Sequence, residues 1–261
     1  MVENNEINLV NAFNIRDLGG YSTIDNRTIK KRRLIRSSYL SSLDSIDQQK
    51  LYNYGVRVII DLRTLDEVEK YPDQFISTTK YLNIPVLRSN EGAAIVKSLV
   101  FKDVFPNQNA GYHHMQKLYY RLIASTEAQE AYHYFFISLA QLGDFGGILF
   151  HCSSGKDRTG VITFLLLKLL GIMPATICHD YLLTNQVSLM EINRRMNEAR
   201  QVSVDPAYLK SIFDISTARL IYYKIAETTI NYLYGSFNAY LHNQLNIDSI
   251  LILKLKRLFL T

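Results

Sequence analysis

The chain has no tryptophan, only two cysteines and only five prolines among its 261 residues. The two cysteines, Cys152 and Cys178, are too few for a disulfide framework in a chain of this length, and they suit a reducing compartment. No proline-rich or glycine-rich tract interrupts the sequence, which argues against a linker between separate domains. We therefore expect a single domain over residues 1–261.

Long apolar runs are also lacking. The longest, Val161 to Leu170, contains Thr163 and Lys168 and is shorter than the roughly 20 apolar residues that a membrane-spanning helix needs. At the N-terminus, acidic residues stand where a signal peptide has basic ones. These features predict a cytoplasmic protein without stable membrane insertion, and they leave a non-classical export route open.

Lysine and arginine exceed aspartate and glutamate by 29 to 24, which gives a formal charge of +5. This excess fits an anionic substrate, although many proteins without one have a similar balance. The densest basic cluster, Lys30 to Arg33, has no aromatic residues between its charges. It favours a solvated turn, and we expect no nucleic-acid partner.

Short apolar segments alternate with helical patterns in the first part of the chain. The segments that predict strands are residues 33–36, 56–60, 81–84 and 147–150. The segments that predict helices are residues 45–54, 127–142 and 159–170. Gly55 and Gly171 follow the first and last of these helices, and Thr126 and Gln129 have capping-box spacing at the start of the second.

From Pro174 onward the pattern is almost wholly helical. Pro174 and Pro206 stand where the first turn of a helix would begin, and Asp205 is a suitable N-cap. The sum is an α/β domain: a small central sheet flanked by helices, with residues 174–261 as a helical part on the same core. Residues 88–124 have aromatic side chains among charges, and they suit either the core or a helical lid insertion.

The segment from His151 to Gly160, with the sequence HCSSGKDRTG, lies between a predicted strand and a predicted helix. That order aims backbone N–H groups and the positive end of the helix at one point, where a phosphate can bind. Five residues separate Cys152 from Arg158, so a tight loop can bring a sulfur and a guanidinium to the same phosphate. The predicted phosphate-binding residues are Ser153, Ser154, Gly155, Lys156, Asp157 and Arg158.

The same electrostatic field stabilises a thiolate, because helix N-termini and cations lower the pKa of a thiol. Cys152 is therefore the predicted nucleophile, with a phosphocysteine intermediate. We expect His151 to fix the loop from behind, and the Thr159 hydroxyl to donate to the sulfur. Two other loop types do not fit this segment. A Walker A phosphate-binding loop needs a glycine at the position of Phe150. Rhodanese-like sulfur-transfer loops also contain a cysteine, but they do not require the Gly-Lys-Asp-Arg-Thr-Gly sequence.

A general acid must protonate the departing oxygen, and Asp157, beside Arg158, is the predicted acid. Many cysteine phosphatases use an aspartate from a separate Trp-Pro-Asp loop, but this chain has no tryptophan. Asp73, in the sequence Tyr-Pro-Asp, is an alternative, and Asp144 is a weaker one. No cofactor or metal is predicted, because the neighbouring pairs Cys178-His179 and His113-His114 lack further ligands at metal spacing.

These motifs resemble those of the bacterial and fungal tyrosine/serine protein phosphatases, an atypical branch with a lipid-phosphatase-like loop. Residues 151–160 match the family pattern His-Cys-x-x-Gly-Lys-Asp-Arg-Thr-Gly at every fixed position. Residues 14–20 resemble its Asn-Phe-Arg-Asp-Leu-Gly-Gly motif, with Ile15 in place of phenylalanine. Residues 60–63 resemble its Asp-Leu-Arg strand end, and residues 180–184 and 234–241 resemble its helical signatures.

The resemblance implies a protein-tyrosine-phosphatase-like fold with a mostly parallel sheet and a helical lid. It also implies Cys152 as nucleophile, Arg158 as phosphate binder and Asp157 as acid, without a metal. Phosphotyrosine is the leading expected substrate, with phosphoserine, phosphothreonine and phosphoinositides as further partners, since Lys156 stands where relatives use a basic residue for phosphoinositide head groups. The alternative is a catalytically silent phosphate-binding module.

Supporting roles are expected for charged residues outside the loop. Asp61 and Arg63 follow a predicted strand, and we expect them to brace its end and to hydrogen-bond to the phosphate loop. Arg16 and Asp17 are expected to be structural, near a turn at Gly19-Gly20. The oligomeric state stays open.

Overall fold

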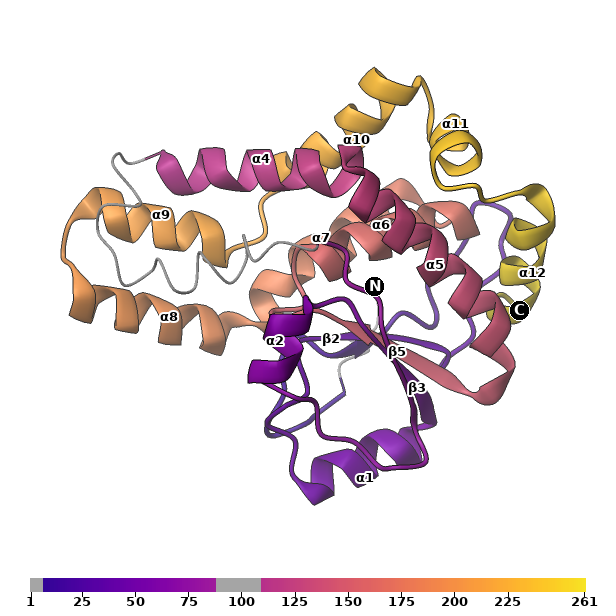
Figure 1. Ribbon diagram of the computed structural model, residues 1–261, viewed down its shortest axis with the longest axis horizontal. Coiled ribbons are helices and arrows are strands. Elements are labelled where there is room, and N and C mark those ends of the chain that lie inside the picture. The colour runs from indigo at the N-terminus through magenta and orange to yellow at the C-terminus, as the bar shows by residue number, and fades with distance from the viewer. Residues whose placement is uncertain (1–6, 88–108) are drawn as a thin grey trace.

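The computed structural model describes residues 7–87 and 109–261, and Figure 1 shows their arrangement. A five-stranded sheet has the order β1-β2-β5-β3-β4, in which β1 alone is antiparallel to its neighbour. The strands are β1 (Arg16–Asp17), β2 (Leu34–Ser37), β3 (Val56–Asp61), β4 (Lys80–Asn83) and β5 (Gly147–His151). The predicted α/β class with a small, mostly parallel sheet is confirmed.

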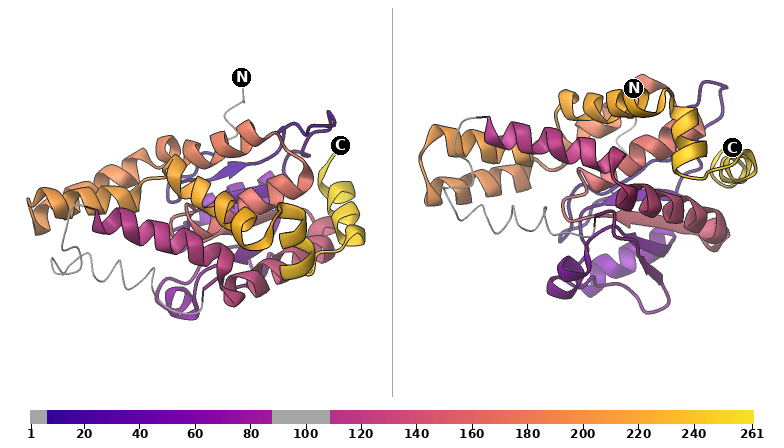
Figure 2. Two further views of the ribbon diagram at one scale, coloured as in Figure 1. Left: turned by 90° about the horizontal axis from the view of Figure 1, so that it is seen from above. Right: turned by 45° about the horizontal axis from the view of Figure 1, so that its top comes forward.

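Apolar side chains cover both faces of the sheet, as is usual for parallel strands. On one face, Ile59 and Leu149 pack with Leu51 of helix α1 (Ser45–Tyr54). On the other, Ile60 and Phe150 belong to the main core, together with residues of most other helices. The right-hand view of Figure 2 shows these two layers, with α1 and most of the helices on opposite sides of the sheet.

The other helices of the described residues, in chain order, complete the fold. They are α2 (Leu65–Lys70), α4 (Ala110–Ala124), α5 (Thr126–Leu142), α6 (Arg158–Leu170), α7 (Pro174–Val187), α8 (Leu189–Val202), α9 (Pro206–Ser216), α10 (Leu220–Tyr234), α11 (Phe237–Ala239) and α12 (Ser249–Phe259). Helices α8 and α9 form a hairpin that extends beyond the sheet, and α4 lies along α9 and α10 (Figures 1 and 2).

Most predicted helix ends agree with the structure. Gly55 and Gly171 have positive φ angles of 113° and 87° after α1 and α6, and Asp205 caps α9 by accepting from Ala207 N at 3.0 Å. The predicted capping box at Thr126 is wrong, because the preceding hydroxyl, that of Ser125, caps α5.

A helical lid insertion was predicted at residues 88–124, and its residues 88–108 lie outside the described residues. Its described remainder is α4, whose side chains Met115, Tyr119 and Leu122 are buried in the main core. Within residues 7–87 and 109–261, none of the helices has the length and apolar character that crossing a bilayer requires.

Candidate active site

The register of the sheet brings the two motif-bearing strand ends together. Asp61, the last residue of β3, pairs with His151, the last residue of β5. Residues 152–157 then connect β5 to α6 at the carboxyl edge of the sheet, where ligands bind in open α/β sheets. Gly155 has φ +66°, and a Cβ at this position would lie 2.4 Å from the Ser37 carbonyl oxygen. The loop path therefore requires glycine there.

Three successive carbonyl groups of the loop are held by the surrounding scaffold. Tyr39 N donates to Ser153 O at 3.1 Å, Asn14 Nδ2 donates to Ser154 O at 2.9 Å, and Arg36 Nη2 donates to Gly155 O at 2.7 Å. In a trans peptide the N–H points opposite to the carbonyl. The scaffold thus turns the following amides toward the opposite side of the loop, which suits an anion.

Arg36 is itself fixed by a buried ionic cluster. Asp180 of α7 lies 2.5 Å from Arg36 Nη1 and 2.8 Å from Arg16 Nε, and it accepts a hydrogen bond from Tyr21 OH at 3.1 Å. Burial opposes the charged carboxylate, but the two arginines outweigh it and lower the pKa of Asp180 to about 2. Arg16 therefore has the structural role expected from the sequence.

Asp17, the neighbour of Arg16, ties down the turn that follows it. Its carboxylate accepts from the backbone N–H groups of Gly19 and Arg32 and from the Tyr54 hydroxyl. This arrangement is structural and lies within the segment whose sequence resembled the family's N-terminal motif.

Arg158 and Ser153 both bind the carboxylate of Glu67, a residue that the sequence motifs did not indicate. Arg158 donates to both carboxylate oxygens of Glu67, at 2.6 and 2.9 Å, and to Ser153 Oγ at 3.0 Å. Ser153 Oγ also donates to Glu67 at 2.5 Å. Burial alone would raise the pKa of Glu67, but Arg158 and Ser153 lower it to about 2. The cluster shows that this loop already binds a carboxylate.

Glu67 reaches Arg158 because α2 starts directly after the Asp61-to-Arg63 segment. Thr64 and Glu67 form a capping box at its N-terminus. The Thr-x-x-Glu spacing was a signal in the sequence for a helix start beside the phosphate loop. The predicted nucleophile, Cys152, is 2% exposed in this arrangement.

Asp157, the predicted acid, is positioned by a tyrosine of α4. Tyr119 OH donates to Asp157 Oδ1 at 2.9 Å and lies 2.7 Å from Tyr181 OH. Burial, followed by the charge of Asp157, raises the pKa of Tyr119 well above its usual value, so its hydroxyl stays protonated. The Asp157 side chain keeps 20% exposure and makes no capping hydrogen bond to α6.

Lys156 points away from solvent. Its Nζ donates to the carbonyl oxygens of Ile215 and Thr217 at the end of α9, the latter at 3.2 Å, and lies 3.6 Å from Asp157 Oδ1. The side chain is 3% exposed, and burial lowers its pKa. Lys156 therefore connects the phosphate loop to the α8–α9 hairpin in this structure.

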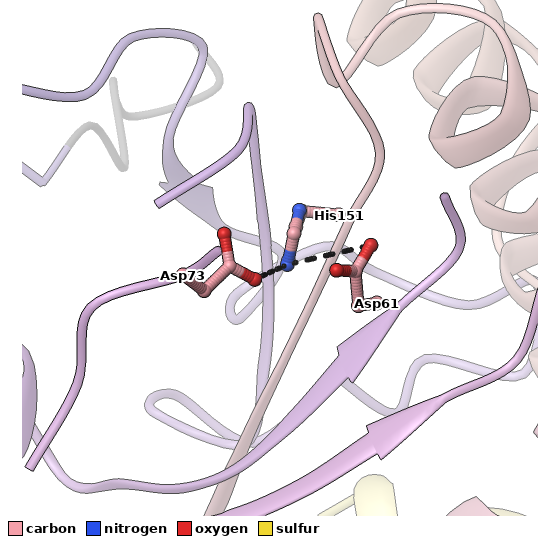
Figure 3. Close-up of side chains that lie close together, drawn as sticks. All are labelled: Asp61, Asp73 and His151. Carbon is pink, nitrogen blue, oxygen red and sulfur yellow. Dashed lines mark ion pairs between the residues drawn. The ribbon is translucent and has the colours of Figure 1, made fainter. Parts of the chain in front are cut away.

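Behind the loop, His151 lies between two aspartates (Figure 3). Its Nε2 is 2.8 Å from Asp73 Oδ2 and 3.9 Å from Asp61 Oδ1, and its Nδ1 is 3.1 Å from Cys152 O. Arg63 pairs with both aspartates, at 2.7 Å from Asp61 and 2.9 Å from Asp73. Although two carboxylates and an imidazole resemble a metal-ligand set, Arg63 already supplies a cation to both carboxylates.

This cluster bears on three expectations from the sequence. The side chains of Asp61 and Arg63 do brace the strand end, but among the described hydrogen bonds neither contacts residues 152–158, and His151 forms the link. The Asp73 side chain is fully buried against Arg63, which leaves no surface for a leaving group. Asp144 precedes β5, at the end of the strand opposite Cys152.

Thr159 lies at the start of α6 and is fully buried. Within the described part of the chain its hydroxyl has no hydrogen-bond partner, so the expected bond to the Cys152 sulfur is not formed in this structure. In the described residues, no cluster of potential metal ligands includes Cys178 or His179.

Comparison with known proteins agrees with the site. The model of the tyrosine phosphatase family matches residues 7–261. A Cupriavidus necator protein assigned as a tyrosine-protein phosphatase is 28% identical over 251 residues, or 90% of this chain and 82% of that protein. The triple specificity protein phosphatase of Mycobacterium tuberculosis is 28% identical over 264 residues, or 90% of this chain and 92% of that protein. The chain belongs to the tyrosine phosphatase family and is a protein-tyrosine phosphatase.

Proposed function

We propose that the enzyme hydrolyses phosphotyrosine through a phosphocysteine intermediate on Cys152. The observation that supports this most is that two residues of the strand–loop–helix segment, Arg158 and Ser153, together bind the Glu67 carboxylate. A phosphoryl group offers the same kind of oxygens to the same donors. Cys152 begins the loop of this segment.

In the first step the Cys152 thiolate attacks phosphorus, so that an S–P bond forms while the P–O bond to tyrosine breaks. Asp157 gives its proton to the departing phenolate oxygen, and Arg158 neutralises charge on the phosphoryl oxygens. In the second step a water attacks phosphorus and gives its proton to Asp157. The S–P bond then breaks, and inorganic phosphate and the thiolate are released.

The position of Asp157 supports this assignment over the alternative acids. Tyr119 fixes one carboxyl oxygen, and the partial exposure of the side chain leaves the group accessible. Asp73 has neither property, because its side chain is fully buried in the ionic cluster behind the loop. The acid therefore comes from within the phosphate loop rather than from a separate loop.

Phosphoserine, phosphothreonine and phosphoinositides are further candidate substrates. The Mycobacterium tuberculosis relative carries the name triple specificity protein phosphatase, which supports a range wider than phosphotyrosine. Lys156 favours substrates with a single phosphate, since its Nζ already binds two carbonyl oxygens and is screened from solvent. A second phosphate of an inositol ring would have to displace these contacts.

The experiment that tests the proposal is a rate panel in the presence of a metal chelator. A phosphotyrosine peptide, a phosphoserine peptide and a set of phosphoinositides are compared for the native protein and Cys152→Ser. We expect chelator-insensitive hydrolysis, fastest on phosphotyrosine, that Cys152→Ser abolishes. Absence of turnover on every substrate would favour the silent phosphate-binding module instead. Loss of activity with the chelator would refute the metal-independent mechanism.

A further inference from the structure

Asp73 binds three segments that surround the nucleophile. Its Oδ1 accepts a hydrogen bond from Leu40 N at 2.9 Å and lies 2.9 Å from Arg63 Nη2. Its Oδ2 lies 2.8 Å from His151 Nε2. Leu40 follows Tyr39, whose backbone N–H holds the Ser153 carbonyl of the phosphate loop. One carboxylate thus connects the segment after β2, the end of β3 and the residue before Cys152.

The two nitrogens of His151 face oxygen atoms that can only accept hydrogen bonds. Nδ1 is 3.1 Å from the Cys152 carbonyl oxygen, and Nε2 is 2.8 Å from the Asp73 carboxylate. The Nδ1 contact is a hydrogen bond when this nitrogen carries its proton, whereas the Nε2 contact is an ion-pair contact without the alignment of a hydrogen bond. The hydrogen bond from Nδ1 and the ion pair at Nε2 exist together only when His151 carries two protons and a positive charge.

The charged groups that face His151 also favour this state. Asp61 lies 3.9 Å from Nε2 and accepts a hydrogen bond from Tyr81 OH at 2.8 Å, while Arg63 pairs with both aspartates. The imidazole is completely buried, and burial by itself disfavours its charge. Asp61 and Asp73 outweigh burial and the opposing charge of Arg63, so that the pKa of His151 lies above its usual value.

We propose that Asp73 is a positioning residue that keeps His151 doubly protonated, so that the imidazolium holds the Cys152 carbonyl and places a buried positive charge next to the nucleophile. A charged donor strengthens the hydrogen bond to the carbonyl and so fixes the backbone from which the sulfur projects. The charge also favours the thiolate. This role rests on the proposed function of Cys152 and deepens it. It also assigns a part to the Tyr-Pro-Asp segment, which the general-acid step does not use.

The first measurement is an NMR titration of the imidazole nitrogens and carbons between about pH 5 and pH 8. The chain has six histidines, so His151→Asn serves to assign the His151 signals. In the native protein we expect His151 to stay an imidazolium over this range. In Asp73→Asn the amide can donate to Nε2, and we expect His151 to lose its proton within the range. A neutral His151 in the native protein at neutral pH would overturn the proposal without any variant.

The second measurement compares kcat/KM of Asp73→Asn with that of the native enzyme as a function of pH. A group with a raised folded-state pKa keeps its proton below that pKa and loses it as the pH rises. The ratio of variant to native kcat/KM should therefore be near one at low pH and fall about tenfold as His151 deprotonates. A structural defect alone would give a ratio that does not depend on pH, and that result would contradict the proposal.

Two further variants separate the outcomes. Asp73→Glu retains a carboxylate and should restore the imidazolium signals in part, whereas Asp144→Asn, the same chemical change at an exposed position, should leave both readouts unchanged. The NMR result does not depend on turnover. A failed titration therefore refutes the role of Asp73, whereas retained activity in Cys152→Ser refutes the proposed function.

Discussion

The Arg158 guanidinium gives both of its terminal nitrogens to the Glu67 carboxylate, at 2.6 and 2.9 Å. Arg158 is the first residue of α6, and Glu67 lies in the first turn of α2. Each side chain is only 12% exposed, so water screens the pair weakly. A phosphoryl group must therefore compete with Glu67 for Arg158, so Glu67 influences the affinity of the enzyme for phosphate.

We expect Glu67→Gln to bind inorganic phosphate more tightly than the native enzyme, by about fivefold to tenfold. Because the pKa of Glu67 is about 2, its carboxylate is charged at any working pH and repels the phosphate dianion. Glutamine keeps an oxygen for Arg158 but loses the charge. Inhibition of aryl phosphate hydrolysis by phosphate measures the effect, with Glu69→Gln on the exposed side of α2 as control. Weaker inhibition would show that Glu67 aligns Arg158 instead of competing for it.

Asp157→Asn tests the general acid. The loss in kcat should be about 10²-fold to 10³-fold for a substrate with a poor leaving group, such as an alkyl phosphate, and below about tenfold for a good leaving group. Tyr119→Phe keeps the Asp157 carboxyl but removes its hydrogen bond from Tyr119, together with the bond between Tyr119 and Tyr181, and should show the same dependence in weaker form. Equal losses for all leaving groups would mean that Asp157 does not protonate the departing oxygen.

Lys156→Met tests whether Lys156 is a structural or a substrate-binding residue. Its removal leaves two carbonyl groups at the end of α9 without their donor, which should lower the free energy of unfolding by about 1–3 kcal/mol. Denaturant unfolding measures this, with the exposed Lys254→Met as control. Rates on phosphotyrosine and phosphoinositide should fall in the same proportion. A loss confined to phosphoinositides would instead place Lys156 on a second phosphate.

Asp180 provides a test of the scaffold behind the loop. Asp180→Asn leaves Arg16 and Arg36 without their carboxylate, and we expect it to lower the free energy of unfolding by about 3–5 kcal/mol at neutral pH. A folded-state pKa lowered to about 2 gives stability that is present above the ordinary carboxyl pKa.

The difference between native and Asp180→Asn proteins should therefore shrink as the pH falls from about 4 toward about 2. Denaturant unfolding over this range measures it. Asp25→Asn is the matched control, because Asp25 pairs with Arg27 in an exposed turn, where an ion pair adds little to stability. A difference that stays constant with pH would contradict the assigned charge state of Asp180.

Local sequence signals were enough to predict the frame of the site. The apolar segments around β3 and β5 predicted buried strands, and the glycines after α1 and α6 predicted helix ends, because each signal depends on neighbouring residues. The capping hydroxyl of α5 was misassigned by one position. Ser125 and Thr126 both have suitable side chains, and only the backbone shows which one lies at the cap.

Residues that contact the site from distant parts of the sequence could not be predicted from such local signals. Glu67 and Tyr119 reach the phosphate loop from 91 and 38 positions away, through the packing of α2 and α4. The Tyr-Pro-Asp sequence made Asp73 an alternative general acid, yet its carboxylate lies behind the loop, against His151. The roles of these residues depend on where the fold places their side chains, and sequence spacing alone does not contain this information.

Trapping of the intermediate is the measurement that tests the central claim most directly. The enzyme is mixed with an excess of aryl phosphate, quenched in acid within one turnover, digested and examined by mass spectrometry. We predict one phosphoryl group on the sulfur of Cys152 in the peptide that contains residues 151–158, and none in Cys152→Ser. A phosphoryl group on another residue, or hydrolysis without any labelled enzyme, would contradict the phosphocysteine mechanism.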